Sequence, residues 1–213
     1  MSNPNTAQFW NNKIIRSRAE LINSPIFIHK NDIVTHEIST IIGRILDVGI
    51  GYGVIEGKLQ DNGNIKLYGI DISDEAIRYA HEHFIGDFRI ATSVNIPYAA
   101  GYFNCVFALD ILEHLNNKQL LLTMGEIARV LKIGGKLIIS VPINESFVDI
   151  KSNRHQRKYS LERLESELKA FRLDIYSRVF LTAFRKFYWI KHYINLILHI
   201  KSPNLLIVMA TKK

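Results

Sequence analysis

Short β-branched runs alternate with helical patterns along most of this chain, and this alternation is the strongest constraint on its fold. Each run has the length of a buried strand, and several of the intervening segments have the length and periodicity of a helix. The predicted strands span residues 44–48, 66–72, 88–92, 105–109, 136–141, 173–180 and 205–211. Such alternation predicts an α/β fold, with a mostly parallel seven-stranded sheet, helices on both faces and right-handed crossovers.

Two helical patterns carry recognisable ends. The segment "SDEAIRYAHEHF" starts at Ser73, whose hydroxyl can cap a helix N-terminus. The segment "NNKQLLLTMGEIARVLKIGG" closes on Gly134 and Gly135, which suit a helix C-terminus. A further helix is expected over "TAQFWNNKIIRSRAELINS", before the first strand, where Phe9 and Trp10 would either close a pocket or anchor the helix on the core.

The chain length of 213 residues predicts a single domain over residues 1–213. Within it, we expect an N-terminal helical cap over residues 1–40 and an amphipathic insertion over residues 181–204, before the last strand. No standard helical crossover joins the last two strands, so the last strand is expected to be antiparallel. With 47% hydrophobic residues, the chain can bury a globular core.

Cysteine content and hydropathy predict a cytoplasmic protein. The only cysteine, Cys105, lies in an apolar stretch, so no intramolecular disulfide can form. The N-terminus lacks the pattern of a secretory signal, and no run approaches the roughly 20 apolar residues of a membrane span. The net charge of +7 is concentrated in the C-terminal third, and it does not by itself choose among nucleic acid, anionic membrane and acidic substrates.

The first predicted strand ends in a glycine-rich turn, "DVGIGYG", that opens a helix from about Tyr52. A strand, a glycine turn and a helix in this order place a nucleotide-like ligand across the carboxyl ends of the strands. Dinucleotide enzymes space these glycines as G-x-G-x-x-G, whereas Gly49, Gly51 and Gly53 stand at every second position. The glycines alone leave a simple tight turn as an alternative.

Acidic residues end two of the predicted strands. Asp71 lies about twenty residues beyond the glycines, where a carboxylate can accept both hydroxyls of a ribose. A helix cap or a solvated loop acid is the alternative for Asp71. Asp110 closes the fourth strand and is followed by Glu113 and His114. The glycines and Asp71 together predict an adenosine-containing ligand.

Four segments between residues 45 and 142 resemble the class I S-adenosylmethionine-dependent methyltransferases, specifically their type 11, ubiquinone/menaquinone-like small-molecule branch. They are "ILDVGIGYG", "YGIDIS", "IPYAAGYFNCVFALDILEHL" and "EIARVLKIGGKLIISVP", in that order. The resemblance implies a Rossmann-like fold, S-adenosylmethionine as cofactor and S-adenosylhomocysteine as product. It also implies a small-molecule acceptor, with an oxygen of a lipid-linked, quinone-precursor or glycan-type compound as the first expectation.

The resemblance also assigns cofactor contacts by position. They are Asp47, Gly49, Gly51, Gly53, Asp71, Ile72, Thr92, Ser93, Val94, Asp110 and Ile111. The glycines would lie against the methionine part, Asp71 would bind the ribose hydroxyls, and Asp110 would lie near the sulfonium. Thr92 stands where the family usually has an acid, and a hydroxyl is a weaker acceptor, so the backbone of Ser93 and Val94 would help to read the adenine.

Histidines supply the catalytic and substrate candidates. His114 is a candidate general base because imidazole titrates near neutral pH, with packing or loop hydrogen bonding as the alternative. His155 and Tyr159 precede a helix that Ser160 would cap, and they are expected to contact the substrate or to structure the loop. The basic residues beside them could meet an acidic substrate or form a solvated face.

No metal site is predicted. His81 and His83 fall two apart on a helix, so their side chains point to different faces.

Other protein classes share parts of this pattern. A dehydrogenase would share the sheet and Asp71 but would require the longer glycine spacing. A nucleic-acid methyltransferase would suit the positive charge, yet amino-group methylation of bases commonly uses an Asn/Asp-Pro-Pro-aromatic motif where this chain has "ALDI", so nucleic acid is not the expected partner. RNA or protein methylation and a non-catalytic cofactor-binding role stay open, and nothing in the sequence indicates an oligomeric state.

The segment from Phe184 to Ile200 is a basic, aromatic and amphipathic helical pattern. Packing on the sheet or covering the pocket is one interpretation. Peripheral contact with a membrane surface or a lipid-linked substrate is the other, because apolar side chains can insert while basic ones attract anionic headgroups.

Overall fold

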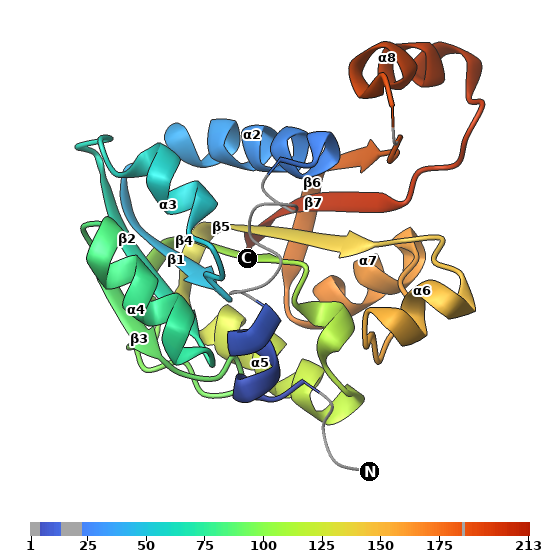
Figure 1. Cartoon of the computed structure of the whole chain (residues 1–213). Helices are drawn as coiled ribbons and strands as arrows, with labels where there is room; N and C mark the ends of the chain where they lie inside the picture. The colour runs from blue at the N-terminus through green and yellow to red at the C-terminus, as the bar shows by residue number, and fades with distance from the viewer. Residues whose placement is uncertain (1–4, 14–22, 185) are drawn as a thin grey trace.

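The computed structural model describes residues 5–13, 23–184 and 186–213. Its strands form a single sheet in the order β3-β2-β1-β4-β5-β7-β6 (Figure 1). The strands are β1 (Gly43–Val48), β2 (Ile65–Asp71), β3 (Asp87–Ile90), β4 (Phe103–Leu109), β5 (Leu131–Pro142), β6 (Leu173–Leu181) and β7 (Leu205–Lys212). β1 to β5 pair in parallel, and β7 is antiparallel to both β5 and β6. The predicted mostly parallel sheet with an antiparallel last strand is confirmed.

Helices cover both faces of the sheet. They are α2 (Pro25–Ser39), α3 (Val54–Leu59), α4 (Asp74–His83), the 3-10 turn η1 (Leu112–His114), α5 (Asn117–Val130), α6 (Phe147–Ser152), α7 (Leu161–Ala170) and α8 (Tyr188–Leu198). α2, α3 and α4 pack on one face, and α5 and α7 pack on the other. Residues 7–13 are helical as well. None of the helices in the described part of the chain is long and apolar enough to cross a membrane.

Side-chain alternation along the strands explains the two core layers. In β1, Ile45 packs on the α2–α4 side and Leu46 on the α5–α7 side. β4 does the same with Phe107 and Val106. Because successive strand residues point to opposite faces, a run that is apolar at every position requires helices on both. Cys105 is one of these buried residues, and its thiol forms no disulfide.

Local capping sets two helix starts as predicted. The hydroxyl of Ser73 accepts a hydrogen bond from the backbone N–H of Ala76 at 3.1 Å, and α4 begins at the next residue. Ser160 caps α7 in the same way through the N–H of Arg163, at 3.3 Å. Since each cap satisfies an N–H that the first helical turn leaves unpaired, these starts follow from nearby residues alone.

The predicted end of α5 at Gly134 and Gly135 is wrong. α5 ends at Val130, and β5 begins at Leu131. The last carbonyls of α5 are taken by neighbours, because Tyr102 N donates to Val130 O at 2.8 Å and Lys212 Nζ donates to Ala128 O at 2.5 Å. Tertiary partners therefore end the helix four residues before the glycines.

The predicted N-terminal helix is covered only in part, because residues 14–22 lie outside the described residues. α2 was not predicted as a separate helix. It begins at Pro25, and proline is favourable at the first position of a helix. α8 falls inside the predicted insertion over residues 181–204. It projects beyond the sheet at one end of the molecule, beside α2 (Figure 1).

Candidate active site

A cavity of about 920 Å³ opens at the carboxyl ends of β1, β2 and β4. This volume lies at the upper end of the range for small-molecule pockets. The predicted site residues that line it are Asp47, Gly49, Gly51, Asp71, Ile72, Thr92, Ser93, Val94, Asp110, Ile111, His114 and His155. Gly53 and Tyr159 are not among the residues that line this cavity.

The glycines of the turn have distinct roles. Gly49 and Gly51 have φ values of +89° and +52°, in the range that favours glycine. A side chain at Gly49 would overlap Ile111, whereas one at Gly51 would meet only a backbone oxygen at 3.8 Å and would enter the cavity. Gly53 begins α3 with a φ of +63°, and a side chain there would overlap Phe84. The absence of a side chain at Gly53 therefore allows packing against Phe84, at the end of α4.

Asp71 is held by backbone donors on the rim of this turn. Its Oδ2 accepts from Gly51 N at 3.0 Å and its Oδ1 accepts from Ser73 N at 2.8 Å. Burial raises the pKa of Asp71, although these two N–H groups act against the rise. Each oxygen keeps a further lone pair, so the carboxylate can still accept two hydroxyl groups of a ligand.

The β3–β4 connection forms the wall where an adenine acceptor was expected. Thr92, Ser93 and Val94 all line the cavity. The hydroxyl of Ser93 is hydrogen-bonded to that of Thr123 on α5, at 2.8 Å. This bond ties Ser93 to the core. Thr92 and the backbone of the segment are therefore the polar groups best placed to bind an adenine base.

Asp110 forms an ion pair with a buried lysine, and the sequence did not reveal this pair. Lys30 of α2 donates to Asp110 Oδ2, and Ser140 Oγ donates to Asp110 Oδ1 at 2.6 Å. Burial acts to raise the pKa of Asp110, but Lys30 and Ser140 outweigh it and lower the pKa below its usual value. Asp110 is thus a fixed negative charge in the cavity wall, positioned from three separate elements.

A second pair of carboxyl groups lies under the glycine turn. Asp47 and Glu56 are both buried, and Glu56 is only 1% exposed. Burial, then the proximity of the two groups, raises the pKa of Asp47, and burial raises that of Glu56 to about 7. The two carboxyl groups are close enough to interact directly with each other. We therefore assign one shared proton to the pair, since two adjacent buried carboxylates repel each other.

Aromatic and imidazole rings gather at the other side of the cavity. The ring centroid of His114 lies 4.8 Å from that of Trp10 and 4.8 Å from that of His155. Burial, together with the proximity of His155 and Lys13, lowers the pKa of His114 to about 3. The ring is therefore neutral at neutral pH, and it is a weaker proton acceptor than the sequence suggested.

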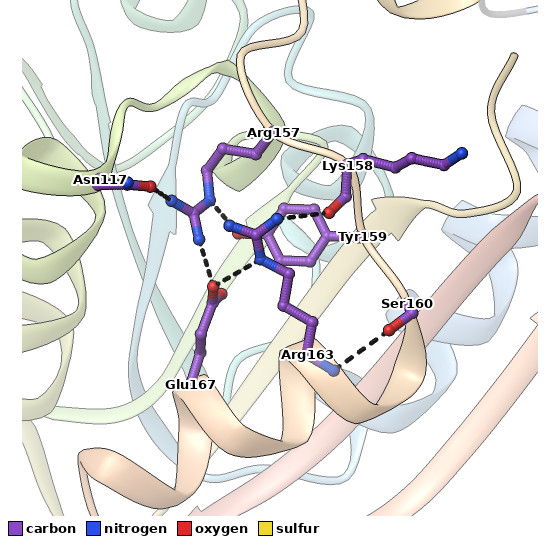
Figure 2. Close-up of polar contacts among 7 residues, drawn as sticks. All are labelled: Asn117, Arg157, Lys158, Tyr159, Ser160, Arg163 and Glu167. Atoms are coloured by element: carbon purple, nitrogen blue, oxygen red, sulfur yellow. Dashed lines mark hydrogen bonds and ion pairs between the residues drawn. The ribbon is translucent and has the colours of Figure 1, made fainter. Parts of the chain in front are cut away.

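The loop that carries His155 is anchored by its neighbours (Figure 2). Arg157 is buried and donates to Asn117 and to Glu167, and its Nε lies 3.3 Å from the hydroxyl of Tyr159. Tyr159 is 2% exposed and belongs to the core. Figure 2 shows that Arg157 joins Asn117 of α5 to Glu167 of α7, with the ring of Tyr159 beside it.

The strand order, the antiparallel β7 and a ligand cavity over the glycine turn and Asp71 together define a class I methyltransferase fold. Residues 46–139 match the family model described as a methyltransferase domain. Residues 46–139 are therefore similar to a methyltransferase domain, and the fold around them is that of the class I, S-adenosylmethionine-dependent methyltransferases.

Similar proteins agree with this assignment. The chain is 30% identical over 135 residues to the phosphoethanolamine N-methyltransferase of Triticum aestivum, covering 58% of this chain and 26% of that protein. It is 29% identical over 115 residues to the O-methyltransferase rstn1 of Aspergillus nomiae, covering half of each. The crystal structure of the N-methyltransferase NodS from Bradyrhizobium japonicum, with S-adenosylhomocysteine, superposes with a TM-score of 0.73 at 16% identity over 98% of both chains. This chain spans between a quarter and a half of the two relatives matched by sequence.

Proposed function

We propose that this protein binds S-adenosylmethionine and transfers its methyl group to a small-molecule acceptor, with residues 1–213 acting as one domain. The observation that carries the proposal is the geometry of Asp71. Its carboxylate is fixed by Gly51 N and Ser73 N at the carboxyl end of β2, beside a glycine turn with open space above Gly51. This arrangement fits a ribose bound by Asp71. It also leaves room beside the ribose for the methionine part of the cofactor, which must approach the backbone closely.

The cofactor supplies a methyl group on a positively charged sulfur. Asp71 would hold the ribose, and the turn at Gly49 and Gly51 would accommodate the methionine part. Asp110 would place a fixed negative charge near the sulfonium, because Lys30 and Ser140 keep it ionised. Trp10 would exclude water from the same side of the cavity. Most of the work that these residues do is alignment, which suits a reaction with a good leaving group.

An oxygen acceptor is the form of the reaction that we favour. The relatives are named for different acceptors, a phosphoethanolamine nitrogen in wheat and an oxygen in the fungal protein. We favour the hydroxyl group of a lipid-linked, quinone-precursor or glycan-type compound. A large cavity with Ile26, Phe27 and Leu205 in its wall is consistent with such an acceptor. We place the reaction in the cytoplasm, at or near a membrane surface.

Calorimetric titration of the full chain tests cofactor binding. We expect S-adenosylmethionine and S-adenosylhomocysteine to bind with micromolar dissociation constants, and NAD to give no heat, because the turn lacks the dinucleotide glycine spacing. Absence of binding by both methionine-derived ligands would contradict the proposal. Transfer is then followed with a labelled methyl group in a screen of phenolic and lipid-linked acceptors.

The proposed membrane contact rests on α8. Among its residues, Tyr188 and His192 are buried against the rest of the protein, while most of the large apolar side chains face outward. The exposed ones on and beside α8 are Phe187, Trp189, Ile190, Tyr193, Ile194, Leu196, Ile197, Leu198 and Ile200. So large an apolar surface on a projecting helix marks an interaction site.

The positive charge around α8 favours anionic lipid as its partner. From residue 175 to residue 213 the chain has seven Lys or Arg residues and no Asp or Glu. The base of α8 contacts a helix that lines the cavity, since the hydroxyl of Tyr188 lies 3.0 Å from His29 Nδ1 of α2, and Phe27 and Lys30 of α2 line the cavity. A helix inserted at the headgroup level would bring lipid-linked acceptors to this opening.

Vesicle sedimentation checks the membrane contact. Wild-type protein should bind vesicles of phosphatidylcholine and phosphatidylserine, and binding should weaken with salt because part of it is electrostatic. The double variant Ile190→Glu/Ile197→Glu changes side chains that are 63% and 77% exposed, so it should fold normally yet bind at least about 10-fold more weakly. Leu121→Glu, at an exposed leucine of α5, is the matched control. Equal binding by all three proteins would contradict the proposal. So would a wild-type protein that dimerises and does not bind vesicles, because a second copy would then be the partner of α8.

A further inference from the structure

Four side chains with metal-binding atoms converge on one side of the cavity. Glu113 and His114 come from η1, Glu145 follows β5, and His155 lies in the loop after α6. One ligand atom each from Glu113, His114 and His155 lie within 4.8 Å of one another. His155 Nδ1 is 2.7 Å from Glu145 Oε1. All four residues line the cavity.

Several polar atoms of this cluster are buried without a hydrogen-bond partner. They are Glu113 Oε2, His114 Nδ1 and Glu145 Oε2, taken over the part of the chain that the structure describes. Glu113 is 1% exposed, His114 7% and Glu145 9%. An unpartnered buried polar atom is costly, and three in one place call for a common partner.

The charges of the surrounding protein do not fill this role. Two lysines face the cluster, but Lys30 is already bound to Asp110. Lys13 Nζ lies over the ring of Trp10, 4.6 Å from its centroid. Glu113 and Glu145 are both buried in the cluster, and buried carboxylates near each other repel. A cation among these groups would remove the repulsion.

We propose that Glu113, His114 and His155 bind a divalent first-row transition-metal ion, with Glu145 beside it. Two imidazoles and a carboxylate are a ligand set that such ions prefer, and three protein ligands leave a position open for another ligand. His114 and His155 supply nitrogen, so Mg²⁺ and Ca²⁺, which prefer oxygen, are the wrong class.

The backbone already fixes the two segments that would carry the ligands. Glu113 O accepts from Gln156 N at 2.7 Å, and Gln156 Nε2 donates to His114 O at 2.6 Å. The loop is held in turn by Arg157, through Asn117 and Glu167 (Figure 2). Such preorganisation keeps His155 opposite η1 without a metal, so the ion would enter a formed site.

The role of the ion rests on the proposed function. Its open position would take the hydroxyl oxygen of the acceptor and lower the pKa of that hydroxyl, and the proton would leave to water. The oxygen lone pair would then form the new bond to the methyl carbon while the carbon–sulfur bond breaks, its electron pair going to sulfur. The ion would thus do the work of the general base for which His114 was the candidate.

Cobalt and zinc titrations of the full chain test this site. Chelator-treated protein, without S-adenosylmethionine, should develop visible d–d absorption as one equivalent of Co²⁺ is added, and Zn²⁺ but not Mg²⁺ should displace it. Glu113→Gln and His155→Ala should each weaken Zn²⁺ binding by roughly 100-fold or more, since even loss of an outer-shell partner costs 10- to 100-fold. His83→Gln, at an exposed histidine of α4, should change nothing.

The outcomes separate this inference from the proposed function. Wild-type protein without the cobalt absorption, or variants that bind Zn²⁺ as tightly as wild type, would overturn the metal site while leaving cofactor binding intact. Metal binding with no affinity for S-adenosylmethionine would overturn only the role in methyl transfer. Circular dichroism checks folding, and Glu113→Gln, which keeps the side-chain shape, decides the question if His155→Ala does not fold.

Discussion

Replacing Asp71 by alanine should lower the affinity for S-adenosylmethionine by about 100-fold or more. A hydrogen bond to a charged group contributes about 1.5–3 kcal/mol, and the carboxylate of Asp71 has free lone pairs on both oxygens for two ribose hydroxyls. A loss of about 3 kcal/mol corresponds to roughly a 100-fold change in the dissociation constant. Isothermal titration calorimetry with S-adenosylmethionine and S-adenosylhomocysteine measures it directly.

Two further variants make the Asp71 result specific. Asp71→Asn keeps one carbonyl oxygen, so it should retain an acceptor for a backbone N–H and show an intermediate loss. Asp61→Ala removes an exposed acid outside the cavity and should bind as wild type does. A folded Asp71→Ala protein with unchanged affinity would show that the ribose is held elsewhere, and the thermal midpoint of each variant establishes whether the turn at Gly51 survives.

Sequence patterns predicted the sheet well because the signals for it are local. The β-branched runs become strands within a few residues of their predicted ends, and Ser73 and Ser160 cap helices through N–H groups three residues away. The end of α5 was missed because partners distant in sequence decide it, Tyr102 and Lys212 among them. The sequence also does not show that β7 inserts between β5 and β6.

The candidate site divides in the same way. Gly49, Gly51 and Asp71 belong to a motif and line the cavity. His114 and His155 are 41 positions apart and come within 4.8 Å, ring to ring, only because the backbone of the second segment bonds to Glu113. No spacing rule covers such a pair, which is why the sequence predicted no metal site. Lys30 was missed for a related reason, since it lies 80 positions before Asp110 in the sequence.

Replacing Glu56 by glutamine should stabilise the protein at pH 8 and change its stability little near pH 4.5. The folded-state pKa of Glu56 is raised to about 7, while an unfolded glutamate titrates near its ordinary value of 4.5. Between these values the folded state holds the extra proton, so the free energy of unfolding falls as pH rises and stays low above pH 7. The largest expected gain is about 3 kcal/mol, at 1.36 kcal/mol for each unit of pKa difference.

Glutamine is the appropriate replacement because its amide can donate to Asp47 as the shared proton does now. Burial and then the Glu56 carboxylate raise the pKa of Asp47 in the wild-type protein. Glutamine at position 56 carries no charge at any pH, so Asp47 can ionise beside an amide donor. Urea unfolding at pH 4.5, 6 and 8 measures the change, and Glu82→Gln, at an exposed acid of α4, is the control. A Glu56→Gln protein with the same pH profile as wild type would show that no shared proton bridges the two carboxyl groups. Asp47 lies near the end of β1, two residues before Gly49. The same result would therefore show that the glycine turn is not supported by a neutralised pair of acids.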